Sequence, residues 1–365
     1  MPNPLPPGDL DANAYTTELA AASIALGELN GIGRTLQNPY LIIAPLQANE
    51  AITSSSMEGT YSTIDDLLIA ETGNKTRSTA EDIREVKNYR QALPNALDSF
   101  DDLPLSLHTI KVAHAQLLQG VAMHRGAKVK PGEFKQTQNF IGARQIEDAR
   151  FIPPPPQQTL DLMQQLEAFL SDNMRSDMPA LVESALVHYQ FETIHPFGDG
   201  NGRVGRMLIT LHLAHRKIMQ QPLLYLSPVL ETRKDEYIDL MFEVSRSGDW
   251  ASWIRFYLAC VTRACERTVR KIGEMFDMQT NFSKRIREVS NSANAVTLVD
   301  ILFERPIISI PQVQRELGVT YRAAQMNVDT LVSLDILRPM DHTSSPRLFV
   351  CQQLIDTIYK NDPDA

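Results

Sequence analysis

Most of the side chains that could do chemistry lie in one stretch, His195 to Arg206, which reads HPFGDGNGRVGR. Apolar segments with helical spacing flank it, over residues 179–192 and 204–216, so we expect a loop that leads into a helix N-terminus. The four glycines of this stretch allow backbone N–H groups to converge on one point. Such a cluster of N–H groups, at the positive end of a helix, is typical of an anion site.

The charged side chains of the stretch indicate which anion and which reaction. Arg203 and Arg206 are three residues apart, so we expect both on one side of the first helical turn, where two guanidiniums suit a polyphosphate. Asp199 offers a hard oxygen ligand to Mg²⁺ on a nucleotide, and His195 can accept a proton near neutral pH. Together they predict phosphoryl or nucleotidyl transfer; the simpler alternative is a solvated loop with glycines for turning.

These residues resemble the signature of the Fic family, HxFx(D/E)GNGRxxR, and every fixed position is matched. The resemblance extends over roughly residues 50–260. It implies an α-helical core that transfers AMP from ATP to a Ser, Thr or Tyr hydroxyl of a target protein and of the chain itself. By position, His195 would deprotonate the target hydroxyl and Asp199 would hold Mg²⁺ on the α- and β-phosphates. Arg206 would grip the γ-phosphate.

The same resemblance assigns the rest of the motif to nucleotide binding. Its remaining residues would cradle the phosphates or complete the segment that does so: Gly200, Asn201, Gly202, Arg203, Val204 and Gly205. Motif residues that bind phosphate do not select adenine, so transfer of another nucleotide or of a phosphodiester group stays open as an alternative.

A second motif, SSSMEG from Ser54 to Gly59, resembles the (S/T)xxxE(G/N) pattern of Fic inhibitory helices. The resemblance implies that Glu58 pairs with Arg206 in the place that a γ-phosphate needs, so that ATP binds in a pose unsuited to in-line attack. Without the Fic loop, a glutamate before a helix-ending glycine would be interpreted as a solvated residue. Glu58 could also orient a water molecule that removes AMP from a modified target.

Two further features are consistent with the resemblance. Residues 132–156 look like the segment that forms the family's flap, a hairpin that holds a target peptide by backbone pairing; a plain surface loop is the alternative. Tyr237 could line the nucleoside end of the pocket by stacking, or it could be a buried core tyrosine. The family often has a second tyrosine after it, where this chain has Ile238.

The fold is predicted to be mainly α, with a small β-hairpin flap and a C-terminal winged helix-turn-helix domain. Ser78 and Glu81 form a candidate capping box for a helix that runs to about Leu93. We expect four regions in the chain: an N-terminal helical region with the inhibitory motif near 54–59 (1–104), a Fic core (105–265), a linking helix (266–292) and a winged-helix-like domain (293–365).

The C-terminal region raises the alternative of a DNA-binding regulator whose Fic loop only senses nucleotide. From residue 291 onward it has six basic and nine acidic side chains, a net charge of −3. Because phosphate contacts supply most non-specific affinity for DNA, this balance argues against a nucleic-acid partner. We therefore expect a role in protein contact, either as a homodimer interface or in target docking.

The composition fits a soluble multidomain protein. The 365 residues carry a net charge of −9 and only three cysteines without CxxC spacing, which suits a reducing compartment and gives no zinc signal. No apolar run approaches the ~18 residues of a membrane span, and MPNPLPPGDL does not resemble an export signal. We expect no membrane contact and a cytoplasmic location.

Overall fold

The computed structural model describes residues 1–359 apart from 9, 37, 75, 102–103, 122–129, 143–144, 172–177 and 341–345. Helices dominate this part of the chain, as expected, and the one sheet is small. None of the described helices is both long and apolar enough to cross a membrane.

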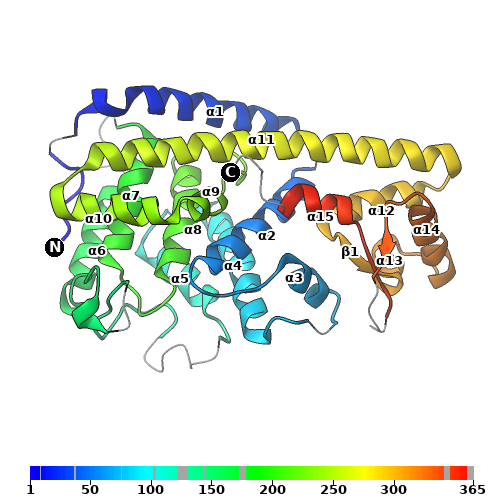
Figure 1. Cartoon of the computed structure of the whole chain (residues 1–365), viewed down its shortest axis with the longest axis horizontal. Coiled ribbons are helices and arrows are strands. Elements are labelled where there is room, and N and C mark those ends of the chain that lie inside the picture. The colour runs from blue at the N-terminus through cyan, green and yellow to red at the C-terminus, as the bar shows by residue number, and fades with distance from the viewer. Residues whose placement is uncertain are drawn as a thin grey trace.

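The N-terminal and central helices form one body around a continuous apolar core (Figure 1). Its helices are α1 (Thr16–Thr35), α2 (Tyr40–Ser56), α3 (Ile64–Glu71), α4 (Ala80–Asp98), α5 (Leu107–Leu117), α6 (Pro156–Leu170), α7 (Ala180–Ile194), α8 (Asn201–His215), α9 (Ser227–Thr232) and α10 (Lys234–Ser247). Helices α7 and α8 are buried on nearly every side, which explains why their sequences are apolar almost throughout.

One long helix, α11 (Trp250–Val289), runs along the whole body and on towards the C-terminal elements, with α1 packed beside it (Figure 1). The expected boundary between a core ending at 265 and a separate linking helix therefore falls inside a continuous helix. Asp249 caps its N-terminus by accepting a hydrogen bond from Ser252 N–H at 3.1 Å.

The C-terminal elements follow beyond α11. They are α12 (Ala293–Glu304), β1 (Ile307–Ser309), α13 (Ile310–Leu317), α14 (Tyr321–Ser333), β2 (Arg338–Pro339), β3 (Leu348–Val350) and α15 (Gln352–Tyr359). The strands form an antiparallel sheet in the order β1-β3-β2, in which Ile308 faces Phe349. Strand β1 was not expected from the sequence. Residues 341–345, between β2 and β3, lie outside the described residues, and the winged-helix assignment stays a prediction.

The starts of two helices, α4 and α6, have local causes. Helix α4 is capped by Thr79, whose hydroxyl accepts from Asp82 N–H at 3.1 Å, so the Ser78–Glu81 capping box is wrong. The Ser78 hydroxyl instead donates to Asp66 of α3 at 2.6 Å. Helix α6 begins at Pro156, because proline is tolerated in the first turn of a helix, where its missing N–H costs nothing.

Candidate functional site

The loop between α7 and α8 carries the candidate base. Helix α7 ends where His195 takes a left-handed conformation (φ 50°), and α8 begins after Gly200 at φ 78°. Asn201 closes this loop: its Oδ1 accepts from Phe197 N–H and its Nδ2 donates to the Phe197 carbonyl, both at 2.8 Å. The Asn201 side chain thus fixes the shape of the loop and is buried, rather than being free for a phosphate as the resemblance implied.

His195 is set up to accept a proton. Its Nδ1 lies 3.3 Å from the carbonyl oxygen of Glu192, and because a carbonyl only accepts, Nδ1 carries the hydrogen. That tautomer leaves Nε2 as the acceptor. Burial and the nearby charge of Lys135 lower the pKa of His195 to about 4, although Glu58 and Asp199 act in the opposite direction. The imidazole is therefore neutral at pH 7, as a general base must be.

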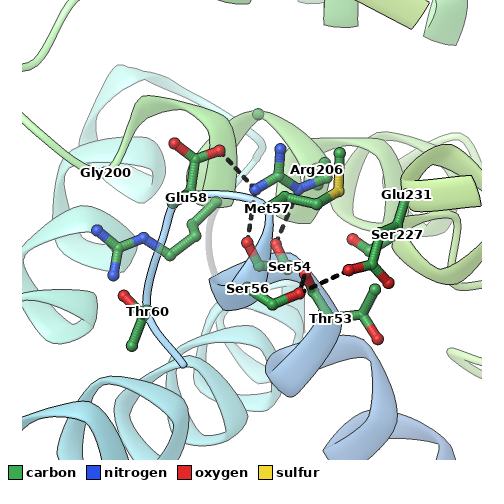
Figure 2. A network of polar contacts seen from close by, with 12 residues as sticks. Thr53, Ser54, Ser56, Met57, Glu58, Thr60, Gly200, Arg206, Ser227 and Glu231 are labelled. Atoms are coloured by element: carbon green, nitrogen blue, oxygen red, sulfur yellow. Dashed lines mark hydrogen bonds and ion pairs between the residues drawn. The ribbon is translucent and has the colours of Figure 1, made fainter. Parts of the chain in front are cut away.

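Arg206 is fully engaged by the inhibitory motif (Figure 2). Its Nη2 contacts Glu58 Oε1 at 2.8 Å and donates to the Ser54 carbonyl at 2.8 Å, while Nε donates to the Ser54 hydroxyl at 2.9 Å. Burial would raise the pKa of Glu58, but the charge and hydrogen bond of Arg206 lower it overall, so the pair is ionic. The expected Glu58–Arg206 pair is present in the geometry.

The turn that carries Glu58 is anchored on both sides. Helix α2 ends at Ser56, and Glu58 lies in the turn that Gly59 completes at φ 84°. On one side, Lys234 Nζ of α10 donates to the Met57 carbonyl at 2.8 Å. On the other, the Thr60 hydroxyl donates to Glu85 Oε2 of α4 at 2.7 Å.

Arg203 does not stand beside Arg206 as expected. Its side chain is fully buried, and Nη1 contacts Glu85 Oε2 on α4 at 2.6 Å. The cavity at the site is lined by Gly202 and Arg206, while Arg203 is turned to α4. A guanidinium that is held by a buried carboxylate stabilises the start of α8, so only Arg206 presents a guanidinium to the cavity from this helix.

Glu192 is a second carboxylate at the site that sequence reasoning missed. It lies on the last turn of α7, and its Oε1 atom is buried and has no hydrogen-bond partner within the described chain. Burial raises its pKa to about 8, Arg206 opposes this and Glu58 adds to it. Gly205 makes room for it, because a Cβ atom there would lie 2.0 Å from Glu192 Oε1.

These residues line a cavity of about 420 Å³, a volume that suits a nucleotide-sized ligand. The lining combines polar side chains, among them His195, Arg206 and Glu58, with apolar ones, among them Phe151 and Phe242. The remaining lining side chains are Met57, Ile141, Arg150, Glu192, Thr193, Lys234, Tyr237, Ile238, Met241 and Ser245. A lining with both charged and apolar side chains suits a ligand with a phosphate tail and a planar base.

Comparisons with known proteins place this arrangement in a family. The Fic/DOC family N-terminal model matches residues 16–98, and the Fic/DOC family model matches residues 104–213, so the two together cover more than half of the chain. The chain belongs to the Fic/DOC family. It resembles a crystal structure of a Fic family protein from Desulfovibrio desulfuricans G20 with a TM-score of 0.60 and 19% identity, over 94% of this chain and 98% of that one.

Other relatives are known by activity. Protein adenylyltransferase Fic of Culex quinquefasciatus is 30% identical over 138 residues, 38% of this chain and 25% of that protein. The protein of the same name from Drosophila ananassae is 27% identical over 164 residues, 44% of this chain and 28% of its own length. Fic-1 from C. elegans (residues 134–508) shares the fold, with a TM-score of 0.56 and 17% identity over 71% of this chain and 74% of that one. The chain thus spans about a quarter of the length of these curated relatives.

Within the Fic fold, the expected flap is only partly a hairpin. Ile141 and Phe151 form a single antiparallel pair, with Ile141 N–H donating to the Phe151 carbonyl at 2.9 Å. The segment between them contains a short 3₁₀ turn (Ile146–Asp148), and residues 143–144 lie outside the described part. Both paired residues line the cavity.

Tyr237 combines the two interpretations that its sequence position left open. It lines the cavity, but its ring is buried and its hydroxyl lies 2.8 Å from His188 Nε2. His188 also contacts the Gly205 carbonyl through Nδ1 at 3.1 Å, so these side chains connect α10 to α8. Tyr237 therefore forms a wall of the cavity from within the core.

The chemistry of Asp199 fits a magnesium ligand. Its side chain is 28% exposed and its Oδ1 accepts from Gly200 N–H at 2.6 Å. Across the described residues, no cluster of three or more metal-binding side chains occurs. Asp199 is not among the residues that line the cavity, and its Oδ1 also lies 3.5 Å from Arg203 Nη2. Mg²⁺ is usually held by one or two carboxylates together with substrate phosphates and water, so a single carboxylate is an adequate protein contribution.

Proposed function

We propose that this chain is a protein adenylyltransferase, which transfers AMP from ATP to a hydroxyl group of a protein. The feature that carries the proposal is the cavity that a neutral His195 and the cation Arg206 line together with apolar side chains. The name of the insect relatives, protein adenylyltransferase Fic, supports the same activity.

In the proposed reaction, His195 Nε2 takes the proton of the target hydroxyl. The oxygen then attacks the α-phosphorus of ATP, a new P–O bond forms, and the bond to the pyrophosphate leaving group breaks. Arg206 holds the terminal phosphate and so keeps the leaving group in line with the attack. The apolar side chains of the lining, among them Phe151 and Phe242, receive the base.

We propose Mg²⁺ as the cofactor, held by Asp199 together with the phosphates of ATP. When bound, it neutralises phosphate charge. The backbone N–H of Gly200 and the His114 ring hold the Asp199 segment in place, since His114 Nε2 lies 3.0 Å from the Asp199 carbonyl.

We further propose that Glu58 is an autoinhibitor. The guanidinium that should receive the γ-phosphate is already engaged by a carboxylate and by Ser54. A triphosphate brought to the same place meets the negative charge of Glu58, so ATP binds in a pose that does not support in-line attack. Removal of this side chain takes the negative charge away from Arg206, which keeps its hydrogen bonds to Ser54, and leaves the His195 side chain in place.

The test is adenylyl transfer by the Glu58→Gly variant. It should label itself and target proteins from ATP at least ~10-fold faster than wild type, because the carboxylate that opposes the γ-phosphate is gone and a barrier lower by about 1.4 kcal/mol is a tenfold gain in rate. The double variant Glu58→Gly/His195→Ala should not label. Glu243→Gly, at a half-buried glutamate of α10 that pairs with Arg246, is the matched control and should behave as wild type.

Intact-protein mass identifies the group that is transferred, because AMP, UMP and phosphocholine adducts differ in mass. Equal labelling by wild type and the Glu58 variant would remove the autoinhibitor from this account. An adduct other than AMP would favour the alternative donors, and labelling that persists without His195 would exclude it as the base.

A further inference from the structure

A short segment ahead of the flap holds the backbone of the catalytic loop. The four consecutive carbonyls from Ile194 to Phe197 all accept hydrogen bonds from Lys135 or Asn139. Lys135 Nζ donates to the Ile194 carbonyl at 3.1 Å and Lys135 N–H to the Pro196 carbonyl at 2.8 Å. Asn139 Nδ2 donates to the carbonyls of His195 at 3.1 Å and of Phe197 at 3.0 Å.

These bonds lie where the loop needs support. His195 has a left-handed backbone with φ 50°, which costs a residue with a side chain roughly 1 kcal/mol. Asn201 supports only Phe197 in this loop. The carbonyls of Ile194, His195 and Pro196 instead accept hydrogen bonds from the Lys135 side chain, the Asn139 side chain and the Lys135 backbone N–H, in that order.

The two donors are themselves linked. Lys135 Nζ donates to Asn139 Oδ1 at 2.9 Å, so the amide is oriented with its NH₂ group towards the loop. Lys135 is only 6% exposed, and long charged side chains are rarely buried unless their hydrogen bonds are satisfied. A buried lysine with two oxygen partners and no carboxylate among them is a costly feature, which indicates a role beyond packing.

We propose that Lys135 and Asn139 are positioning residues for His195: together they hold the strained loop so that the imidazole faces the cavity. We call these two residues the clamp. The proposal rests on the proposed function, because the clamp would position the base of that reaction. It also links the flap to the base, since Asn139 is two residues ahead of Ile141, which pairs with Phe151 at the cavity wall.

Besides holding the loop, Lys135 carries a charge that acts on the pKa of His195. Burial lowers the pKa of Lys135 to about 8, so the ammonium is still mostly protonated at pH 7. Burial first and this charge second lower the pKa of His195, while Glu58 of the inhibitory turn and Asp199 of the loop raise it. The other ionisable groups that share the cavity are Arg150, Glu192, Arg206, Lys234 and Tyr237.

The experiment compares variants in the full chain that also carries Glu58→Gly, so that transfer is measurable. Lys135→Met removes the charge and keeps the length, Lys135→Arg keeps the charge, and Asn139→Asp replaces the donating NH₂ group by an acceptor. Lys130→Met is the matched control, because Lys130 lies in the same loop but its side chain is 61% exposed and pairs with Glu133.

We expect Lys135→Met and Asn139→Asp to lower kcat by about 10- to 100-fold, as small misplacements of a catalytic group do, with KM for ATP changed less than about threefold. Lys135→Arg should recover much of the rate and Lys130→Met all of it. In Lys135→Met, NMR titration of the His195 ring should give a pKa above that of the parent, because a repelling charge is gone.

A kcat within twofold of the parent in both Lys135→Met and Asn139→Asp overturns the proposal. A variant in which the fall in kcat is matched by an equal fall in affinity for ATP also overturns it, because that pattern indicates general disruption of the site. The His195 titration needs no ATP and no transfer. If even the Glu58→Gly parent is inactive, the proposed function fails, yet an unchanged His195 pKa in Lys135→Met would still decide against the clamp.

Discussion

Arg206 is the cation around which three carboxyl groups of the site are arranged. Glu58 pairs with it directly, while Glu50 and Glu192 lie close enough for its charge to lower their pKa values. Burial outweighs that effect and raises the pKa of Glu50 and Glu192, whereas the pKa of Glu58 is lowered by the ion pair. One guanidinium thus compensates one carboxylate, and burial favours the neutral form of the others.

The burial of Glu192 predicts that the free energy of unfolding depends on pH. Its pKa of about 8 in the folded chain exceeds the ordinary 4.5, so the folded state binds the proton more tightly, and stability falls as pH rises from about 4.5 to 8. Glu192→Gln cannot ionise and avoids the cost. Urea denaturation should show the variant more stable than wild type by about 1–3 kcal/mol at pH 8 and equal to it at pH 5.

Glu243→Gln serves as the control for that measurement, because Glu243 pairs with Arg246 on the surface of α10. It should show the wild-type pH dependence. A Glu192 variant whose stability runs parallel to wild type between pH 5 and pH 8 would contradict a protonated carboxyl at this position.

At the scale of elements, the turn after α2 decides where Glu58 stands. Gly59 has φ 84°, and no atom lies within 4 Å of the place where its Cβ would be, so a substitution there tests the backbone alone. Gly59→Ala should cost about 1 kcal/mol and displace the turn, which raises AMP transfer above the wild-type level. Gly59→Asn, which tolerates this conformation, should stay near wild type.

Transfer by the two variants is measured from intact mass after incubation with ATP. If Gly59→Ala labels itself no faster than Gly59→Asn, the position of Glu58 does not depend on this turn.

The sequence predicted the elements around the site well, and the misses have physical causes. The helix–loop–helix from α7 to α8 follows from motif and spacing, and the pair Glu58–Arg206 is what the resemblance to Fic inhibitory helices implied. Local rules could not choose Thr79 over Ser78 as a cap, because the choice depends on Asp66 of another helix.

Long-range contacts explain the remaining misses at the site. The partner of Arg203 is Glu85, which is 118 residues away in sequence, so i,i+3 spacing alone placed this guanidinium on the wrong side. The clamp residues Lys135 and Asn139 lie in a segment without periodicity. The only signal for Glu192 was its place three residues before His195, where its carbonyl orients the imidazole.

At the scale of the whole molecule, α11 connects the Fic core to the C-terminal elements, and α15 returns to pack on α2 and α11. Lys271 of α11 donates to the Ile358 carbonyl at the end of α15, which suits the negative end of that helix. The C-terminal elements are thus joined to the core by packing as well as by the chain.

The length of α11 predicts a gain in stability from one substitution. Gly273 lies exposed in its interior, and no atom comes within 4 Å of the position that a Cβ would take there. Gly273→Ala should raise the free energy of unfolding by about 0.5–1 kcal/mol, because alanine loses less backbone entropy in a helix. Gly248→Ala is the opposite control: at φ 76° it should lower stability. Thermal denaturation followed by circular dichroism measures both, and equal shifts would contradict the backbone argument.

Because Glu58 and Arg206 belong to one polypeptide, the local concentration of the blocking group is set by the fold and not by how much protein is present. Under the proposed autoinhibition, dilution therefore does not relieve the block, and added ATP meets a carboxylate that never diffuses away. We expect release to require a shift of the turn after α2, so that the activating event acts on conformation and not on protein concentration.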